Sequence, residues 1–238
     1  MVTEKLSVNQ ADFVPIIGSA ILVYLVAAIF LHSGPPEVLE FIAKCGFLII
    51  LLPFLKKIGI TTNGLKNYSS KRVTSDFIKA TKYFLIILIS VIAVIFLLAF
   101  VFGLISSFSH PGTVFWERII NGGGNQLGIY TANYAFKSPI ATFFYLSTVC
   151  VVAPIGEEIF FRRFLFVFLR KKHSKGFSMF ISGIVFGGVH FGGFISAAIM
   201  GFILAYIYEK EEKLAIPIIL HALKNSTAVI IVLIRSFI

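Results

Sequence analysis

Long apolar stretches, separated by short polar and basic segments, run through most of this 238-residue sequence. A helix needs about twenty mainly apolar residues to cross a hydrocarbon core of about 30 Å. Lipid offers no partner to the backbone polar groups, so stretches of this kind fold as helices. We therefore predict an all-α fold, a polytopic helical membrane protein with about seven (six to eight) transmembrane helices. The expected helices cover residues 11–31, 38–55, 77–106, 138–169, 177–191, 193–208 and 214–234.

The composition and the placement of charge agree with a membrane protein. Apolar residues make up 58% of the chain, against roughly 45–50% in soluble domains. The net charge of +10 comes from basic residues that concentrate in segments 56–76 and 170–176. Basic loops of this kind mark the cytoplasmic side of a membrane, which explains the charge without a nucleic-acid partner. The expected location is the cell membrane, with the N-terminus inside and the C-terminus outside.

Two parts are expected along the chain. Residues 1–137 would hold N-terminal transmembrane helices and one long external connection, 107–137, and residues 138–238 would form a helical core with the chemistry. Lys44 lies inside the second apolar stretch. We expect its side chain to snorkel or to face a cavity, and the sequence assigns it no role.

The most unusual charges are two adjacent carboxylates, Glu157 and Glu158, in the fourth apolar stretch. A carboxylate in such surroundings must be paired, hydrated or protonated, and it indicates a functional site. Glu158 and Arg162 are four residues apart, so they share a helix face and can pair. Glu157 points about 100° away and remains available for chemistry. A purely structural ion pair between Glu158 and Arg162 is the alternative.

Two further polar motifs follow on later helices. Phe186 and His190 are four residues apart, and so are His221 and Asn225. Each pair should therefore share one face of its helix. A histidine and an asparagine side by side can donate two hydrogen bonds, which is what stabilisation of an oxyanion requires. Glycines at 183, 187, 188 and 192 form overlapping GxxxG patterns, which permit close approach of helix backbones.

Taken together and in this order, EExxxR, FxxxH and HxxxN resemble the CPBP family. That family comprises type II CAAX prenyl proteases and bacteriocin-processing or immunity proteins, also called Abi proteins. The resemblance covers about residues 149–230. It implies an intramembrane endopeptidase that uses a glutamate and needs neither metal nor cofactor, and that acts on a membrane-associated protein or peptide from the cytoplasmic side. The site residues that it implies are Glu157, His190, His221 and Asn225 as catalytic groups, with Glu158, Arg162 and Phe186 as supporting groups.

The chemistry of these side chains is consistent with that function. A carboxylate in a low-dielectric pocket can act as a general base for water, and His221 and Asn225 can hold the resulting oxyanion. Three alternatives remain open at this point. Two histidines and a carboxylate can bind zinc, a non-catalytic bacteriocin-immunity or partner-binding protein can use the same motif as a polar core, and a proton-coupled transporter also carries intramembrane Glu and His. The substrate, its prenylation and the oligomeric state are not encoded in any recognisable pattern.

Overall fold

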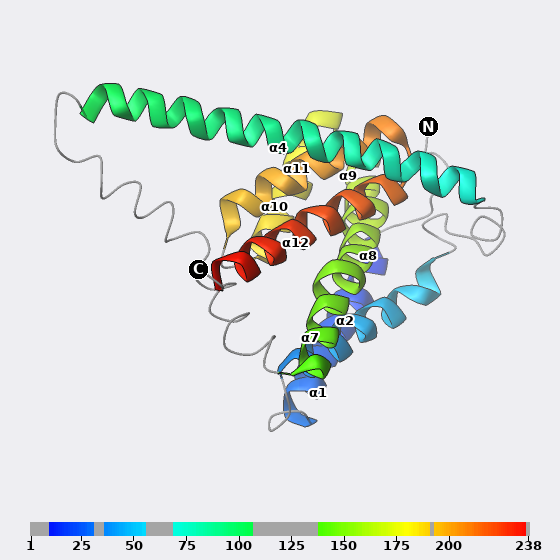
Figure 1. Cartoon of the computed structure of the whole chain (residues 1–238). Helices are drawn as coiled ribbons and strands as arrows, with labels where there is room; N and C mark the ends of the chain where they lie inside the picture. The colour runs from blue at the N-terminus through cyan, green and yellow to red at the C-terminus, as the bar shows by residue number, and fades with distance from the viewer. Residues whose placement is uncertain (1–9, 31–35, 56–68, 107–137, 191–192, 237–238) are drawn as a thin grey trace.

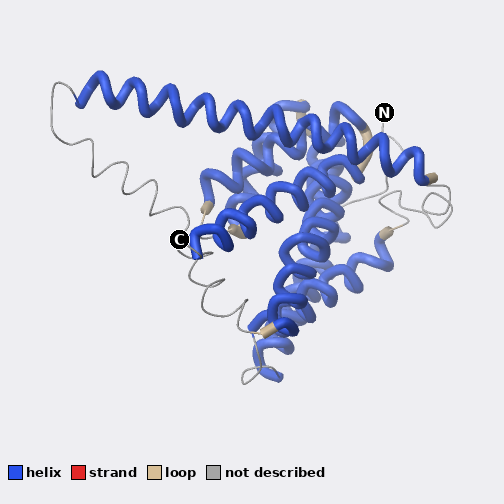
Figure 2. The backbone as a smooth tube through the Cα atoms, in the orientation of Figure 1, coloured by secondary structure: helices blue, strands red, loops and turns tan. Residues whose placement is uncertain are grey.

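A computed structural model describes residues 10–30, 36–55, 69–106, 138–190 and 193–236, and within these ranges the chain is helical and contains no strand (Figures 1 and 2). The all-α prediction is confirmed. The helices are α1 (Phe13–Phe30), α2 (Pro36–Leu51), α4 (Ser70–Ser106), α7 (Pro139–Ser147), α8 (Ala153–Glu158), α9 (Val167–Lys172), α10 (Lys175–Gly188), α11 (Phe194–Glu211) and α12 (Ala215–Ser236).

Three of the described helices are long and apolar enough to cross a membrane: Ser70–Leu98, Pro139–Lys172 and Ala215–Ile234. Phe13–Val23 is a shorter apolar helix. The expected stretches 177–191 and 193–208 also form helices, α10 and α11. The chain is therefore a helical membrane protein, and the number of crossings stays a prediction.

One boundary in the predicted pattern was wrong. The third helix begins at Ser70 rather than near residue 77, so the end of the basic segment 56–76 is already helical. The backbone N–H groups of Arg72 and Val73 both donate to the carbonyl of Ser69. Lysine and arginine have good helix propensity, so a helix can begin before its apolar part does. The predicted external connection 107–137 lies outside the described residues.

A continuous helical rod, residues 139–172, forms the axis of the molecule (Figure 1). Ser138 caps its start by accepting a hydrogen bond from the Ala141 N–H. Two π-helical segments, Thr148–Val152 and Ile159–Phe166, flank α8 within the rod. Helix α2 packs against the first half of the rod, α10 and α11 against the second half, and α12 against its middle. Pro154 therefore lies inside a helix that it does not break.

Ion pairs join the start of α4, the end of α9, the end of α11 and the residues just before α12 at one end of the molecule. Arg170 at the end of α9 contacts Glu209 at 3.1 Å, and Lys79 of α4 contacts Glu211 at 2.6 Å. Lys213, which precedes α12, contacts Asp76 of α4 at 2.6 Å. The start of α4 and the end of α9 hence lie at the same end of the fold. That the two basic segments share one side of the membrane stays a prediction. Helix α4 packs on α12 and then extends beyond the other helices (Figure 1).

Candidate active site

Glu157 lies in α8, in the middle of the rod, and its side chain is 11% exposed. Its Oε1 is 2.7 Å from the Nζ of Lys44 on α2. Its Oε2 is 3.5 Å from the Nε2 of His190, which follows the end of α10. The two oxygens of this carboxylate thus contact side chains from two separate parts of the chain. The structure brings Glu157 and His190 together, as a shared site requires.

His190 is held by the residue one turn earlier. Its Nδ1 is 2.6 Å from the carbonyl oxygen of Phe186, and the two rings stack with centroids 4.5 Å apart. A carbonyl oxygen only accepts hydrogen bonds, so Nδ1 carries a proton. Nε2 is then the nitrogen that faces Glu157. In neutral imidazole this nitrogen has a free lone pair, and in imidazolium it donates.

Close packing of α10 on α11 sets the position of this pair. A Cβ on Gly183 would lie 2.8 Å from the backbone oxygen of Ala198, and one on Gly187 would lie 2.7 Å from that of Phe194. Only glycine permits such an approach, so the first predicted GxxxG pair does bring two backbones together. Gly188 faces open space, and Gly192 lies outside the described residues.

Glu158 is fully buried and makes a different set of contacts. Its Oε2 accepts from Nε of Arg162 at 2.7 Å, as their spacing predicts. The guanidinium also donates to Oγ of Ser182 at 3.1 Å and to the carbonyl of Gly201 at 2.9 Å. Arg162 therefore joins the rod to both α10 and α11. A buried arginine with this many acceptors fixes the relative positions of three helices.

His221 of α12 contacts Glu158, with Nδ1 3.1 Å from Oε1. Because a carboxylate accepts, Nδ1 of His221 carries the proton in this contact. For Nε2 to donate to a substrate oxygen as well, the ring must be an imidazolium. His221 therefore contacts the carboxylate that follows Glu157 in the chain.

Asn225 lies one turn beyond His221 and donates from Nδ2 to the carbonyl of Val149 at 2.9 Å. Val149 belongs to a π-helical segment, in which carbonyls pair with the N–H five residues later. The residue five positions after Val149 is Pro154, which has no N–H. Asn225 supplies the missing donor. An amide nitrogen has two hydrogens, so the second can serve a ligand.

Lys44 is the residue of this site that the sequence analysis did not assign. A lysine in the middle of an apolar stretch was itself a signal, since such groups are costly and usually serve a function. Its partner, however, is 113 residues away, and only the rotation and packing of α2 determine that contact.

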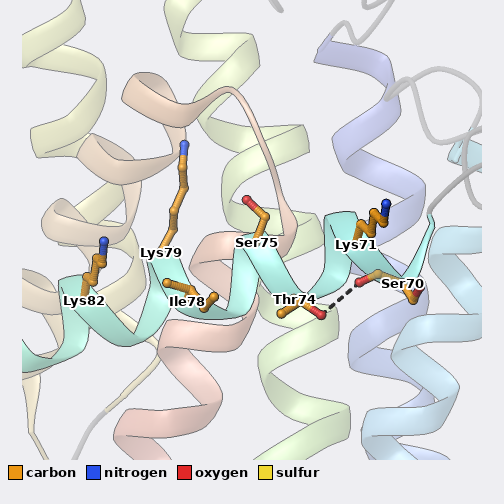
Figure 3. Close-up of a pocket in the computed structure, with 7 residues that line it drawn as sticks. All are labelled: Ser70, Lys71, Thr74, Ser75, Ile78, Lys79 and Lys82. Atoms are coloured by element: carbon orange, nitrogen blue, oxygen red, sulfur yellow. Dashed lines mark hydrogen bonds between the residues drawn. The ribbon is translucent and has the colours of Figure 1, made fainter.

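Other places on the fold offer little comparable chemistry. Within the described ranges, no group of three or more His, Cys, Asp or Glu side chains could hold a metal ion. A shallow pocket on α4 is formed by one helix alone and shares no residue with the site described above (Figure 3). It is lined by Ser70, Lys71, Thr74, Ser75, Ile78, Lys79 and Lys82.

Comparison with known proteins finds one family model that covers most of this site. Residues 139–227 match the family model of Rce1-like type II CAAX prenyl endopeptidases. Residues 139–227, the Rce1-like segment, are similar to that domain. All seven predicted site residues lie within it, whereas Lys44 lies outside. The family resemblance inferred from the three motifs is thereby confirmed.

A curated relative supports the same assignment over a shorter range. The Bacillus subtilis (strain 168) protein named "Putative membrane peptidase YdiL" is 35% identical over 82 residues. The alignment covers 34% of this chain and 34% of that protein, so it spans about a third of the relative. No solved structure matches this chain.

Proposed function

We propose that this chain is a membrane endopeptidase in which Glu157 activates water to hydrolyse a peptide bond of a membrane-associated protein or peptide. The observation that carries the proposal is a nearly buried carboxylate that faces His190 inside an Rce1-like segment. A general base must lie within hydrogen-bond reach of the proton that it removes. A neighbouring group that also binds the water can make this proton transfer more efficient. Residues 138–238 would form the catalytic core.

In the proposed reaction, a water molecule binds beside the facing atoms of Glu157 and His190 and contacts both. Glu157 takes one proton while the water oxygen bonds to the carbonyl carbon of the substrate, and the carbonyl electrons move to its oxygen. When the tetrahedral intermediate collapses, the C–N bond breaks and the proton passes to the leaving amine. Phe186 supports this step by stacking on the imidazole and accepting from its Nδ1.

The negative charge of the intermediate would be stabilised from α12. His221, oriented by Glu158, can donate from Nε2 once it is an imidazolium, and Asn225 can donate its second amide hydrogen. Removal of one such donor typically costs about 10²–10³ in kcat. Arg162 contributes indirectly, because it neutralises Glu158 and fixes the helix that carries both glutamates.

The substrate would reach the site from the cytoplasmic side of the cell membrane. The ion-paired end of the fold, with Arg170 and Lys172, carries the basic charge typical of that side. Prenylated protein C-termini, secreted leader peptides and bacteriocins are all substrates of compatible chemistry. A role in bacteriocin immunity would follow if the peptide attacked were a toxin.

The first experiment compares peptide termini by mass spectrometry in membrane and secreted fractions from cells that express either the wild type or Glu157→Gln. The substitution keeps the size of the side chain and removes the base, so termini that depend on wild type identify both proteolysis and the substrate. We expect a loss of at least about 10³-fold in cleavage for Glu157→Gln.

Matched expression and an unchanged melting temperature in detergent serve as controls for folding. Identical termini from the two cell types would contradict the proposal. If a protective phenotype persisted in Glu157→Gln under those conditions, the alternative of a non-catalytic immunity or partner-binding protein would replace it.

A further inference from the structure

The shorter of the two described ion-pair contacts of Glu157 comes from outside the Rce1-like segment. Lys44 lies on α2, and its Nζ is 2.7 Å from Oε1 of Glu157. The side chains of Lys44 and Glu157 are 21% and 11% exposed. Lys44 lies in the middle of α2, which the sequence predicts to cross the membrane, and a charged side chain in such a position is costly. Because an apolar residue would fit this helix without that cost, the presence of Lys44 indicates a functional role.

The contact controls which oxygen of Glu157 is available. Lys44 binds Oε1, and Oε2 is then the oxygen that faces Nε2 of His190 at 3.5 Å. A carboxylate tethered at one oxygen loses the rotation about its terminal bond, so the direction of the second oxygen is fixed. Placement of a catalytic group to within about 0.5 Å is what efficient catalysis demands.

We propose that Lys44 is a positioning residue for Glu157, which binds Oε1 and directs Oε2 toward His190. This inference rests on the proposed function, because it concerns how that function's base is prepared. It also implies that the Rce1-like segment alone is incomplete, since α2 supplies one of the groups that the base requires.

Several other charged groups surround the same carboxylate. Glu40 lies one turn before Lys44 on α2, His221 and Lys224 lie on α12, and Glu158 with Arg162 lies on the rod itself. Arg162 and His221 are engaged with Glu158, and Lys224 donates to Asn225 at 3.3 Å. Among the groups that the structure describes on these elements, Lys44 is the cation in direct contact with Glu157.

The test uses purified full-length protein in detergent and a synthetic peptide that spans the cleavage site found by the terminus comparison. Four variants are compared with wild type: Lys44→Met, Lys44→Gln, Lys44→Arg and Lys82→Met. Lys82 is an exposed lysine on α4, so its replacement is a matched control for loss of one positive charge. Lys44→Gln serves as the second neutral variant where Lys44→Met fails to accumulate.

We expect the neutral variants to lower kcat by about 10²-fold, because a misplaced catalytic group costs roughly that factor. KM should change less than kcat. Lys44→Arg should keep at least a tenth of the activity, and Lys82→Met should match wild type.

A second readout is independent of cleavage. Lys44→Met leaves a nearly buried carboxylate without its cation and should lower the melting temperature, and adding Glu157→Gln should restore most of that loss. Wild-type kcat in both neutral variants would overturn the inference while leaving the proposed function intact. If wild type itself shows no Glu157-dependent cleavage, the proposed function fails and the inference fails with it.

Discussion

At the scale of single residues, two neighbouring glutamates have different surroundings because helical geometry separates them by about 100°. Glu158 is fully buried, and it meets both Arg162 and His221. Glu157 keeps some exposure and reaches groups from α2 and from the end of α10. One carboxylate is thus committed to structure, and the other is placed where a substrate and water could meet it.

Arg162→Met should destabilise the fold by about 3–5 kcal/mol, because it leaves the buried charge of Glu158 without its cation. The acceptors at Ser182 and Gly201 would also lose their donor. Thermal unfolding in detergent measures the effect, and Arg72→Met, at an exposed arginine of α4, serves as control.

The double variant Glu158→Leu with Arg162→Met should be more stable than Arg162→Met alone, since it removes the stranded charge as well. If Arg162→Met melted at the wild-type temperature, the pair would contribute nothing to the fold, and Arg162 would have no structural role.

At the scale of elements, a π-helical segment in the rod and the close approach of α10 to α11 position the site. The π-helical segment and Pro154 leave the Val149 carbonyl to Asn225, so a feature that would normally weaken a helix becomes a link to α12. In α10, Gly183 lets α11 approach so closely that the Gly201 carbonyl comes within 2.9 Å of Arg162.

Gly183→Ala should separate α10 from α11 and destabilise the protein by about 1–3 kcal/mol, the usual cost of overpacking. The added Cβ would lie 2.8 Å from a backbone oxygen, which cannot move as a side chain can. Gly176→Ala on the same helix faces open space, so it should be neutral or gain up to about 1 kcal/mol of helix propensity.

Thermal melting compares these two alanine variants directly, and cleavage should fall in Gly183→Ala only. Equal stability of the two would mean that α10 and α11 do not approach at Gly183 as the structure has them.

At the scale of the whole molecule, the sequence predicted what local geometry determines. The pair Glu158–Arg162 and the stack of Phe186 on His190 both follow from a four-residue spacing, and the structure contains both. The sequence did not predict contacts between helices, because packing sets the rotation of each helix about its own axis. The bond of Lys44 to Glu157, and the choice of Glu158 as the partner of His221, are of that kind.

The same packing makes a prediction about sidedness, because ion pairs unite helix ends that the basic segments assign to the cytoplasm. In a background with Cys45→Ser and Cys150→Ser, which removes the two cysteines of the chain, single cysteines replace Lys137, Lys171 or Lys210. A membrane-impermeant maleimide added to intact cells should label Lys137→Cys. It should reach Lys171→Cys and Lys210→Cys only after permeabilisation.

Labelling of Lys171→Cys and Lys210→Cys from opposite sides would contradict the packing of α9 and α11, whose ends Arg170 and Glu209 join. Labelling of both from outside, with Lys137→Cys protected, would keep the fold and invert it in the membrane. Glu157 lies about 20 Å along the rod from its basic end, at about 1.5 Å per residue. An inverted fold would therefore present this site to substrates from the external side, and a secreted peptide would become the favoured substrate.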